Sequence, residues 1–528
     1  ITVRRSEGSR GRVSVTYAAN TNVPPPPVVS VPSLPIARDG SDFTAVSGVL
    51  TWEDGDLSDK QFAVPILNDG AGEGPELANL ELRSPTGGAA VRPDPRALLT
   101  IADDDRDYAD VQMYNMNCKE LRIWIPRKAP IRGLFMYMPG SGGDSRWIAN
   151  YKTDWKAICT YWGCALMGQV QDLLARSSPA GAAQMWDILR VAGGFAGRPE
   201  LANAPYMLTG YSLGGLASGE AVQAWPDGAI GWAGYMGGNN LTMPPQLVKN
   251  IPGLFIAGEK DNNAIVGYTP LRNMFTQWRT NNLPVSYAIE WGVAHKDDAG
   301  QAYEMGLLFL HETWRTRYPT NRVPGLAMGD TVPLNPIDMS NGWYAQTPSV
   351  GSPVYYMTIG PETNFAPDKT LASWMPTEAA AMYYRAFTSV HSSYRPSNYP
   401  AEKPFQSPGR FTAPTPFAIY SPGAPVDITF DWRAGEQPVN TVTMYYETEP
   451  IALLSNAPWA TVISNPPSGP HGITATAALQ IGTEKHSFQI FTVQTPDAPE
   501  RPTELCAAPH AAANIKLAWR DNANDEAG

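Results

Sequence analysis

Hydrophobic and polar positions change their spacing along the chain, and this change predicts three regions of different structure. Short alternating or β-branched runs, which are typical of strands, lie at 13–17, 48–52, 61–66 and 97–101. Similar runs at 426–432, 442–446 and 472–477 follow near the other end. In between, apolar runs at 133–138, 206–209, 251–258 and 285–289 alternate with stretches of helical spacing. The pattern predicts a multidomain protein in which a central α/β unit is flanked by all-β sandwiches.

One junction between a strand and a helix carries the clearest chemical signal. The segment Gly210-Tyr211-Ser212-Leu213-Gly214-Gly215 follows the run 206–209 and precedes a helical pattern at 216–222. A sharp turn of this kind needs glycines around the serine, because side chains there would clash with the crossing backbone. Ser212 at its tip is accessible to a base and is predicted to be a nucleophile. The alternative is a structural turn with an incidental serine.

The order of residues along the chain limits the choice of base. The histidines are His295, His311, His391, His471, His486 and His510. None precedes Ser212, which excludes the chymotrypsin-like and subtilisin-like orders. His295 follows the run 285–289 and precedes an amphipathic pattern at 302–314, so we predict that it is the base. His311 lies inside that pattern, where we expect a packing or surface role.

An acid that orients the base is expected between the serine and the histidine. The run 251–258 ends in Glu259-Lys260-Asp261-Asn262. We predict Asp261 as this acid, with Glu259 as the alternative, because a carboxylate must hold the imidazole and stabilise its cationic form. An aspartate after a strand is also an ordinary turn residue.

An oxyanion hole requires two backbone N–H donors. Leu213 follows the nucleophile at a helix N-terminus, where amides lack intrahelical partners, so it is the first expected donor. The second is expected in the glycine-rich loop 139–144, which follows the run 133–138. Ser141 is the candidate there, and Gly142 is the alternative.

Residues from about 110 to 320 resemble an α/β-hydrolase through the segments 139–143, 210–215, 258–261 and 294–295. The resemblance is to secreted esterases of the polyhydroxyalkanoate-depolymerase and feruloyl-esterase type. Many of these relatives carry His-Gly where this chain has Pro139-Gly140. The resemblance implies a mostly parallel sheet with helices on both faces. It also implies a serine carboxylic-ester hydrolase that needs no cofactor for catalysis and acts on a polymeric or cell-wall ester.

The first hundred residues resemble a Calx-beta domain. The matching segments are 40–43, 48–52, 66–69 and 99–105. Members of this family often bind Ca²⁺ through acids that match Asp42, Asp69, Glu73, Asp103, Asp104 and Asp105. Carboxylates that converge at one end of a sandwich suit a structural Ca²⁺ ion. A solvated acidic turn is the other interpretation, and both stay open.

The remaining segments complete a modular chain. Residues 411–495 look like an immunoglobulin-like sandwich, and 515–522 resemble the first strands of a fibronectin type III domain. We expect both ends to continue into other modules of a longer parent chain. The predicted domains are a Calx-beta-like sandwich that lacks its first strand (1–106), the hydrolase (107–320), an extension packed on it (321–410), the immunoglobulin-like sandwich (411–495), and a linker with the start of the fibronectin-like module (496–528).

Composition excludes several classes of function. The net charge of −11, without long acidic runs, argues against nucleic acid and anionic membrane surfaces as partners. No run of about 18 apolar residues occurs, so no membrane span is predicted. The four cysteines form no C-x-x-C pair. Cys159 and Cys164 are expected as buried thiols, or as a disulfide if the chain is secreted. The modular organisation predicts an extracellular or cell-surface protein.

Two other functions stay open at this stage. A peptidase or amidase on the same fold has the same triad. A non-catalytic adhesion or scaffolding protein with a retired hydrolase domain fits the flanking sandwiches. The intact set of Ser212, Asp261, His295 and the motif glycines argues against the scaffold, because no structural role requires all of them together.

Overall fold

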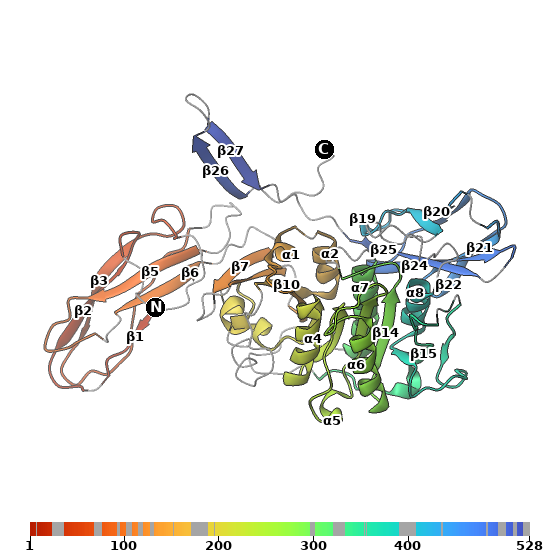
Figure 1. Cartoon of the computed structure of the whole chain (residues 1–528). Coiled ribbons are helices and arrows are strands. Elements are labelled where there is room, and N and C mark those ends of the chain that lie inside the picture. The colour runs from red at the N-terminus through yellow and green to blue at the C-terminus, as the bar shows by residue number, and fades with distance from the viewer. Residues whose placement is uncertain are drawn as a thin grey trace.

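The central unit is built on one eight-stranded mixed sheet of order β14-β13-β12-β11-β9-β10-β8-β7 (Figure 1). The computed structural model describes the chain except residues 7, 24–35, 68–75, 92–94, 102–107, 115–119, 127–130, 152, 171–187, 195, 296–300, 320–332, 353, 355, 390–407, 435, 436, 482, 483, 495–502, 510–514 and 521–528. The strands of the sheet are β7 Tyr108–Tyr114, β8 Glu120–Pro126, β9 Gly133–Met138, β10 Cys164–Gln169, β11 Tyr206–Tyr211, β12 Ala229–Tyr235, β13 Gly253–Gly258 and β14 Val285–Glu290. Strands β9 to β14 are parallel, and β8 and β7 add an antiparallel edge.

Helices cover both faces of this sheet. They are α1 Arg146–Tyr151, α2 Thr153–Trp162, the 3₁₀ helix η1 Pro199–Asn203, α4 Leu213–Ala224, α5 Pro245–Val248, α6 Tyr268–Thr280 and α7 Ala302–Arg317. Every position of β9 is buried, as expected for a strand covered on both sides. Leu134 and Met136 pack in the core that includes α4 and α6. Phe135 and Tyr137 point to the opposite core, with α1, α2 and α7.

The connections between the strands diverge at β9. β10 and β11 pair with β9 on opposite sides. In open α/β sheets, ligands bind beyond the carboxyl ends of the strands where the direction of the connections changes. Ser141 follows β9 and Ser212 follows β11, so both candidate segments leave the sheet at this point.

A small three-stranded sheet and one helix pack against the edge of the central unit. They are the 3₁₀ helix η2 Met339–Asn341, β15 Trp343–Ala345, β16 Ile359–Pro361, β17 Ser373–Met375 and α8 Glu378–Thr388. Thr377 caps α8 by accepting a hydrogen bond from Ala380 N at 3.1 Å. Arg279 of α6 is buried and donates to the carbonyl oxygens of Lys369 and Ala372. These bonds tie the small sheet to the central unit.

Two further sheets form a sandwich near the C-terminal end. The sheets have the orders β18-β20-β23 and β19-β25-β24-β21-β22. The strands are β18 Gly409–Ala413, β19 Ala418–Tyr420, β20 Val426–Trp432, β21 Val439–Tyr446, β22 Glu449–Leu454, β23 Trp459–Ile463, β24 Gly469–Leu479 and β25 Lys485–Val493. Every residue of β25 is buried. Phe491 and Val493 belong to the core of the sandwich, whereas Phe488 and Ile490 belong to the core that contains α7 and α8. The sandwich is therefore packed directly on the central unit.

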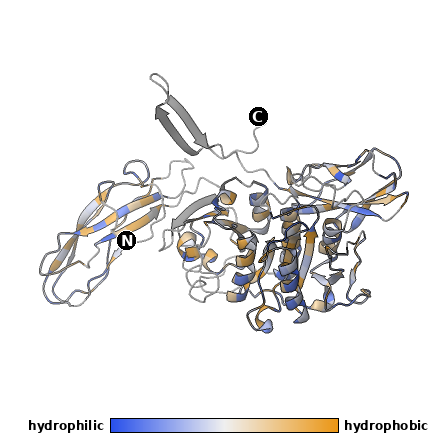
Figure 2. Ribbon diagram, in the orientation of Figure 1, coloured by the Kyte–Doolittle hydropathy of each residue, from blue (hydrophilic) through white to orange (hydrophobic). Residues whose placement is uncertain are grey.

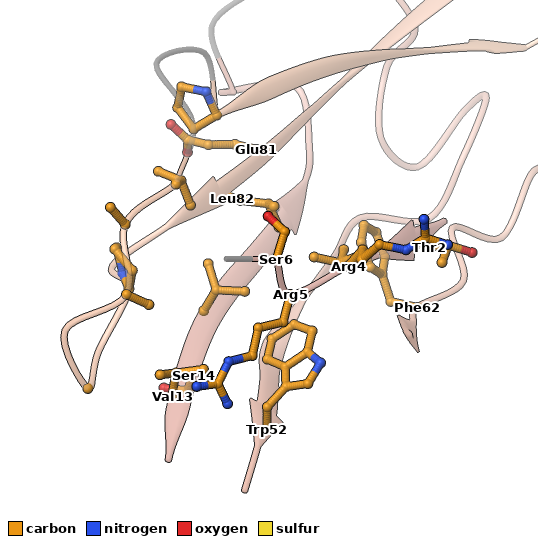
Figure 3. Close-up of a pocket in the computed structure, with 18 of the residues that line it drawn as sticks. Thr2, Arg4, Arg5, Ser6, Val13, Ser14, Trp52, Phe62, Glu81 and Leu82 are labelled. Atoms are coloured by element: carbon orange, nitrogen blue, oxygen red, sulfur yellow. The ribbon is translucent and has the colours of Figure 1, made fainter. Parts of the chain in front are cut away.

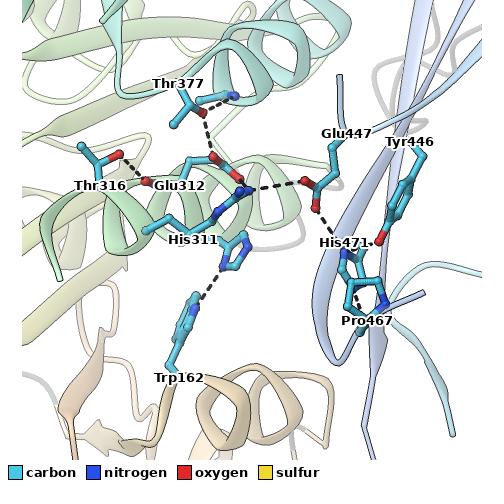
Figure 4. Close-up of polar contacts among 11 residues, drawn as sticks. Trp162, His311, Glu312, Thr316, Thr377, Tyr446, Glu447, Pro467 and His471 are labelled. Atoms are coloured by element: carbon cyan, nitrogen blue, oxygen red, sulfur yellow. Dashed lines mark hydrogen bonds and ion pairs between the residues drawn. The ribbon is translucent and has the colours of Figure 1, made fainter. Parts of the chain in front are cut away.

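Polar side chains also cross this junction (Figure 4). Arg315 of α7 lies 2.9 Å from Glu312 and 3.4 Å from Glu447 of the sandwich. Glu447 in turn contacts His471 Nδ1 at 3.1 Å, and Glu312 accepts a hydrogen bond from the Thr377 hydroxyl at 2.7 Å. One arginine thus connects α7, the cap of α8 and the sandwich.

The N-terminal unit contains the antiparallel sheet β3-β2-β5-β6 and the short pair β1-β4. Their bounds are β1 Thr2–Val3, β2 Val13–Ala19, β3 Val46–Trp52, β4 Lys60–Gln61, β5 Glu76–Arg83 and β6 Arg96–Ile101. The strands carry both hydrophobic and hydrophilic residues (Figure 2), as expected for a sheet with one solvated face. The predicted strand at 61–66 is wrong beyond Gln61. Pro65 cannot donate to a strand ladder, and Ile66 makes only an isolated bridge with Phe43.

A pocket of about 760 Å³ opens into the N-terminal unit (Figure 3). Trp52 and Phe62 line it, and Arg5 lies beside the Trp52 indole. The Arg5 guanidinium donates to the carbonyl oxygens of Arg10 at 2.9 Å and Gly11 at 3.2 Å. Arg5 therefore holds the first segment of the chain over the hydrophobic core.

Near the end of the chain, β26 Thr503–Pro509 and β27 Ile515–Arg520 form an antiparallel pair. Together these sheets make a multidomain chain with several β-sheets and one mixed α/β sheet. Among the helices in the described part of the chain, none is both long and apolar enough to cross a membrane.

Glu304 provides a pH-dependent test of how the sandwich is packed. Its carboxylate lies in the first turn of α7 and accepts the Ile490 N–H of β25 at 2.7 Å. Burial raises the pKa of Glu304 to about 8. The same carboxyl group has a pKa of about 4.3 in the unfolded chain. Between about pH 4.3 and pH 8, Glu304 is therefore protonated in the folded protein and ionised in the unfolded chain. Stability from this group is therefore full below about pH 4.3 and declines as pH rises towards 8.

We predict that Glu304→Gln, which keeps an acceptor for Ile490 N–H but cannot ionise, loses less stability than the wild type as pH rises from 5 to 8. The difference should be on the order of 1 kcal/mol per pH unit. Apparent melting temperatures of both proteins across this range measure it. Parallel pH dependences would show that Glu304 is not buried as described.

Candidate active site

Ser212 occupies a strained turn between β11 and α4. Its backbone angles are φ 53° and ψ −117°, a combination that non-glycine residues rarely adopt. The Ser212 N–H donates to Tyr235 O of β12 at 2.8 Å, and α4 begins at the next residue, Leu213. A serine in such a turn presents its hydroxyl beyond the carboxyl edge of the sheet.

The glycines around Ser212 are required by close backbone contacts. A Cβ on Gly214 would overlap the carbonyl oxygen of Met138, at the end of β9. A Cβ on Gly210 would lie 2.5 Å from the Gly214 backbone. A Cβ on Gly215 would lie 2.9 Å from Gly237 Cα, after β12. The first turn of α4 therefore packs tightly between the ends of β9 and β12, the two strands on either side of β11.

Three side chains from three loops form one hydrogen-bonded chain. His295 Nε2 lies 2.8 Å from Ser212 Oγ, and His295 Nδ1 lies 2.7 Å from Asp261 Oδ2. The other carboxylate oxygen of Asp261 accepts the Asn263 N–H at 3.1 Å. The Asp261 side chain is 1% exposed, whereas that of His295 is 27% exposed. The structure thus brings together the serine, base and acid chosen from the sequence.

Glu259, the alternative acid, makes a different contact. Its carboxylate accepts the Gly292 N–H at 2.9 Å, in the loop that leads to His295. Burial raises the pKa of Glu259, and the hydrogen bond from Gly292 opposes this shift. Of the two acids considered, Asp261 is the one hydrogen-bonded to the imidazole.

The two expected oxyanion donors lie on adjacent segments. Leu213 is the first residue of α4, where the helix supplies no acceptor for its amide. Ser141 is exposed in the turn after β9. This turn is closed by a hydrogen bond from Gly143 N to Gly140 O at 2.9 Å, so it uses the amide of Gly143. The contact between Met138 O and Gly214 places the start of this loop against the first turn of α4.

Tyr211 and Gly237 lie near the triad, and of these two only Gly237 was not singled out in the sequence. The Tyr211 ring lies 5.3 Å from the His295 imidazole, centroid to centroid, and a Cβ on Gly140 would lie 2.9 Å from Tyr211 Cδ1. A Cβ on Gly237 would overlap Ser212 O. In the sequence, the signal for the close approach of Gly237 to Ser212 was the Gly237-Gly238 pair that follows an apolar run.

His311, Cys159 and Cys164, which were also considered in the sequence, are buried in the core. His311 is 4% exposed, and its Nδ1 accepts a hydrogen bond from Trp162 Nε1 at 3.1 Å. Burial lowers the pKa of His311 to about 3, so the residue packs as a neutral imidazole. Cys159 and Cys164 are buried free thiols, which decides against a disulfide between them.

The predicted calcium acids fall mostly outside the described residues. Asp42 is 9% exposed, and its Oδ2 accepts the Arg38 N–H at 2.6 Å. The others, which lie outside the described part of the chain, are Asp69, Glu73, Asp103, Asp104 and Asp105. Within the described residues, no group of three or more His, Cys, Asp or Glu side chains could hold a metal.

Comparisons with known proteins give weak, partial similarities. No protein-family model matches the chain, and no curated protein matches it. An esterase from the archaeon Pyrobaculum calidifontis matches with a TM-score of 0.28 at 13% identity, over 39% of this chain and 84% of that chain. The apo-form Calx CBD1 domain matches with a TM-score of 0.17 at 23% identity, over 20% and 80% of the two chains. Fibronectin(III)-like modules of Clostridium thermocellum CbhA match with a TM-score of 0.16 at 21% identity, over 16% of this chain and 94% of that chain. Similarity at this level carries no inference about function.

We predict that Gly214→Ala strongly lowers the reactivity of Ser212. The new methyl group must displace either β9 or α4, and a shift of about 1 Å in a reactive group costs on the order of 100-fold in rate. Gly194→Ala is the matched control, because a Cβ there meets no atom within 4 Å. Labelling by a fluorophosphonate probe, on protein shown to be folded, compares the two variants. Equal labelling would show that the first turn of α4 is not tightly packed.

Proposed function

We propose that this chain is a secreted serine carboxylic-ester hydrolase on an α/β-hydrolase fold. The observation that supports the proposal is the continuous hydrogen-bonded chain from Ser212 through His295 to Asp261, which starts at a strained strand-to-helix turn. A buried acid, a partly exposed imidazole and a serine at the tip of such a turn form the arrangement that activates a serine for acyl transfer. Nothing about packing requires all three side chains to meet.

In the proposed reaction, Ser212 Oγ attacks the ester carbonyl carbon while His295 Nε2 accepts the hydroxyl proton. Asp261 holds the imidazole through Nδ1 and stabilises its cationic form. The backbone N–H groups of Leu213 and Ser141 donate to the oxyanion of the tetrahedral intermediate, at about 3 kcal/mol for each donor. His295 then protonates the leaving alcohol. Water attacks the acyl-enzyme by the same steps and releases the carboxylic acid.

The substrate is proposed to be a polymeric or cell-wall ester outside the cell. Ser212 and His295 are both partly exposed, so the reactive atoms lie at an accessible edge of the sheet. An amide substrate would use the same triad, so the experiment below includes a matched amide.

We predict that a fluorophosphonate probe labels the wild type at Ser212. Ser212→Ala should abolish labelling, and His295→Ala should reduce its rate by about 1,000-fold or more, because the serine loses its base. Ser218→Ala is the control: this serine lies on α4 but is buried and hydrogen-bonded to Gly214 O at 2.9 Å. Peptide mapping of the labelled protein identifies the modified residue.

Turnover of matched ester and amide substrates decides the reaction class. Faster turnover of the ester supports the proposal, and faster turnover of the amide indicates a peptidase or amidase. A folded wild-type protein that is neither labelled nor active would favour the non-catalytic scaffold.

We also propose a structural Ca²⁺ ion in the N-terminal unit, held by Asp42 with Asp69, Glu73, Asp103, Asp104 and Asp105. The set consists of carboxylates, the ligands that Ca²⁺ prefers, and Asp42 is itself buried, with its carboxylate turned towards the Arg38 N–H. The ion would neutralise the charges of these carboxylates and join their loops at one end of the N-terminal unit.

We predict that EDTA lowers the melting temperature of the N-terminal unit, because bound Ca²⁺ stabilises only the folded state. Adding back Ca²⁺, but not Mg²⁺, should restore it, and ester turnover should be unaffected. Differential scanning calorimetry of the full chain measures both states. Identical scans with EDTA and with Ca²⁺ would exclude a stabilising ion and favour solvated acidic turns.

A further inference from the structure

The loops that carry the acid and the base are joined along their backbones. Glu259 N donates to Glu290 O at 3.0 Å, and Lys260 N donates to Val293 O at 2.8 Å. These bonds continue the pairing of β13 with β14 beyond the ends of both strands. The segment after β13 therefore lies beside the start of the loop that carries His295.

The Glu259 side chain adds a contact from one loop to the other. Its carboxylate accepts the Gly292 N–H at 2.9 Å, and the side chain is 9% exposed. Gly292 has a φ of 79°, which a residue with a side chain rarely adopts. This turn aims the amide of Gly292 at Glu259, three residues before His295.

A second glutamate holds the other end of the same loop. Glu290 is the last residue of β14, and its Oε1 accepts the Gln301 N–H at 3.0 Å. Gln301 is the N-cap residue of α7. The chain is thus attached to carboxylates at Gly292 before His295 and at Gln301 after it.

This loop needs anchors because regular structure does not hold His295. The described residues 291–295 form neither helix nor strand. A base must nevertheless be placed within about 0.5 Å of its productive position. The hydrogen bond to Asp261 fixes the direction of the ring, but the position of the backbone depends on the loop.

We propose that Glu259 and Glu290 are positioning residues that clamp the histidine loop from both sides and keep His295 Nε2 aligned with Ser212 Oγ. This inference rests on the proposed hydrolase function. Neither glutamate contacts the reacting atoms, so their effect passes through the loop backbone. Loss of a clamp should lower kcat while KM stays almost unchanged, because substrate binding does not use the imidazole position.

The chain offers a matched control for this test. Glu200 of η1 makes the same kind of contact, with its Oε1 accepting the Ile131 N–H at 2.9 Å, but it lies in a different part of the fold. Glu259→Met removes the acceptor at similar size, whereas Glu259→Gln keeps an oxygen for Gly292. Glu290→Met and Glu290→Gln form an independent pair if one methionine variant fails to fold.

We predict that Glu259→Met lowers kcat for an ester by about 10- to 100-fold, with KM within about twofold of wild type. Glu259→Gln should recover most of the activity. Glu200→Met should lower the melting temperature and leave kcat unchanged. Hydrogen–deuterium exchange of a peptide covering 290–295 should be faster in Glu259→Met than in the wild type or Glu259→Gln.

The two measurements separate the clamp from the proposed function. Unchanged exchange at 290–295 in Glu259→Met, or an equal kcat for Glu259→Met and Glu200→Met, overturns the clamp. Faster exchange in a protein whose wild type has no hydrolase activity leaves the clamp in place and removes the proposed function.

Discussion

The close backbone contact between β9, β11 and α4 is the constraint on which the candidate site depends. Ser212 holds a conformation that costs on the order of 1–3 kcal/mol. It persists because the first turn of α4 is packed against Met138 O on one side and Gly237 on the other. The same contact sets the path of the loop that contains Ser141. One steric requirement therefore fixes both the turn at Ser212 and the start of the loop that contains Ser141.

The position of His295 depends on longer-range packing. His295 is carried on a loop that ends at α7, and α7 lies between the central sheet and the C-terminal sandwich. Glu304 and Arg315 connect this helix to the sandwich. The C-terminal sandwich therefore packs against the helix that follows the histidine loop. It is not a separate module that is joined to the central unit by a linker alone.

Local sequence patterns predicted the elements that local physics determines. The turn at Ser212 needs glycines at fixed offsets, so its strand, serine and helix could be recognised from a few consecutive residues. The start of α8 at Thr377 follows from the same kind of local capping rule. No histidine precedes Ser212 in the sequence, and His295 is the one that follows a predicted strand of the α/β unit. It was therefore the predicted base.

Features that depend on distant partners were harder to predict in this way. The sequence favoured Asp261 and left Glu259 as the alternative, because both follow the same strand, and the folded backbone shows that Asp261 reaches the imidazole. The packing of the C-terminal sandwich on the central unit was not predicted either. The sequence of β25 is typical of an ordinary strand, and only the structure shows that both of its faces are buried. The strand expected at 61–66 ends at Gln61, because it also depends on a partner strand, and Pro65 has no N–H to offer one.

The contrast in exposure between acid and base explains how one site can be both rigid and accessible. Asp261 is almost fully buried, and its two oxygens are used by Asn263 N–H and by His295 Nδ1. A buried acceptor with both oxygens engaged has little freedom to turn, so the imidazole it holds is restricted in rotation. The opposite edge of the ring, with Nε2, faces Ser212 at the partly exposed side. The imidazole is therefore held from inside the fold, while Ser212 and His295 stay partly exposed at the edge of the sheet.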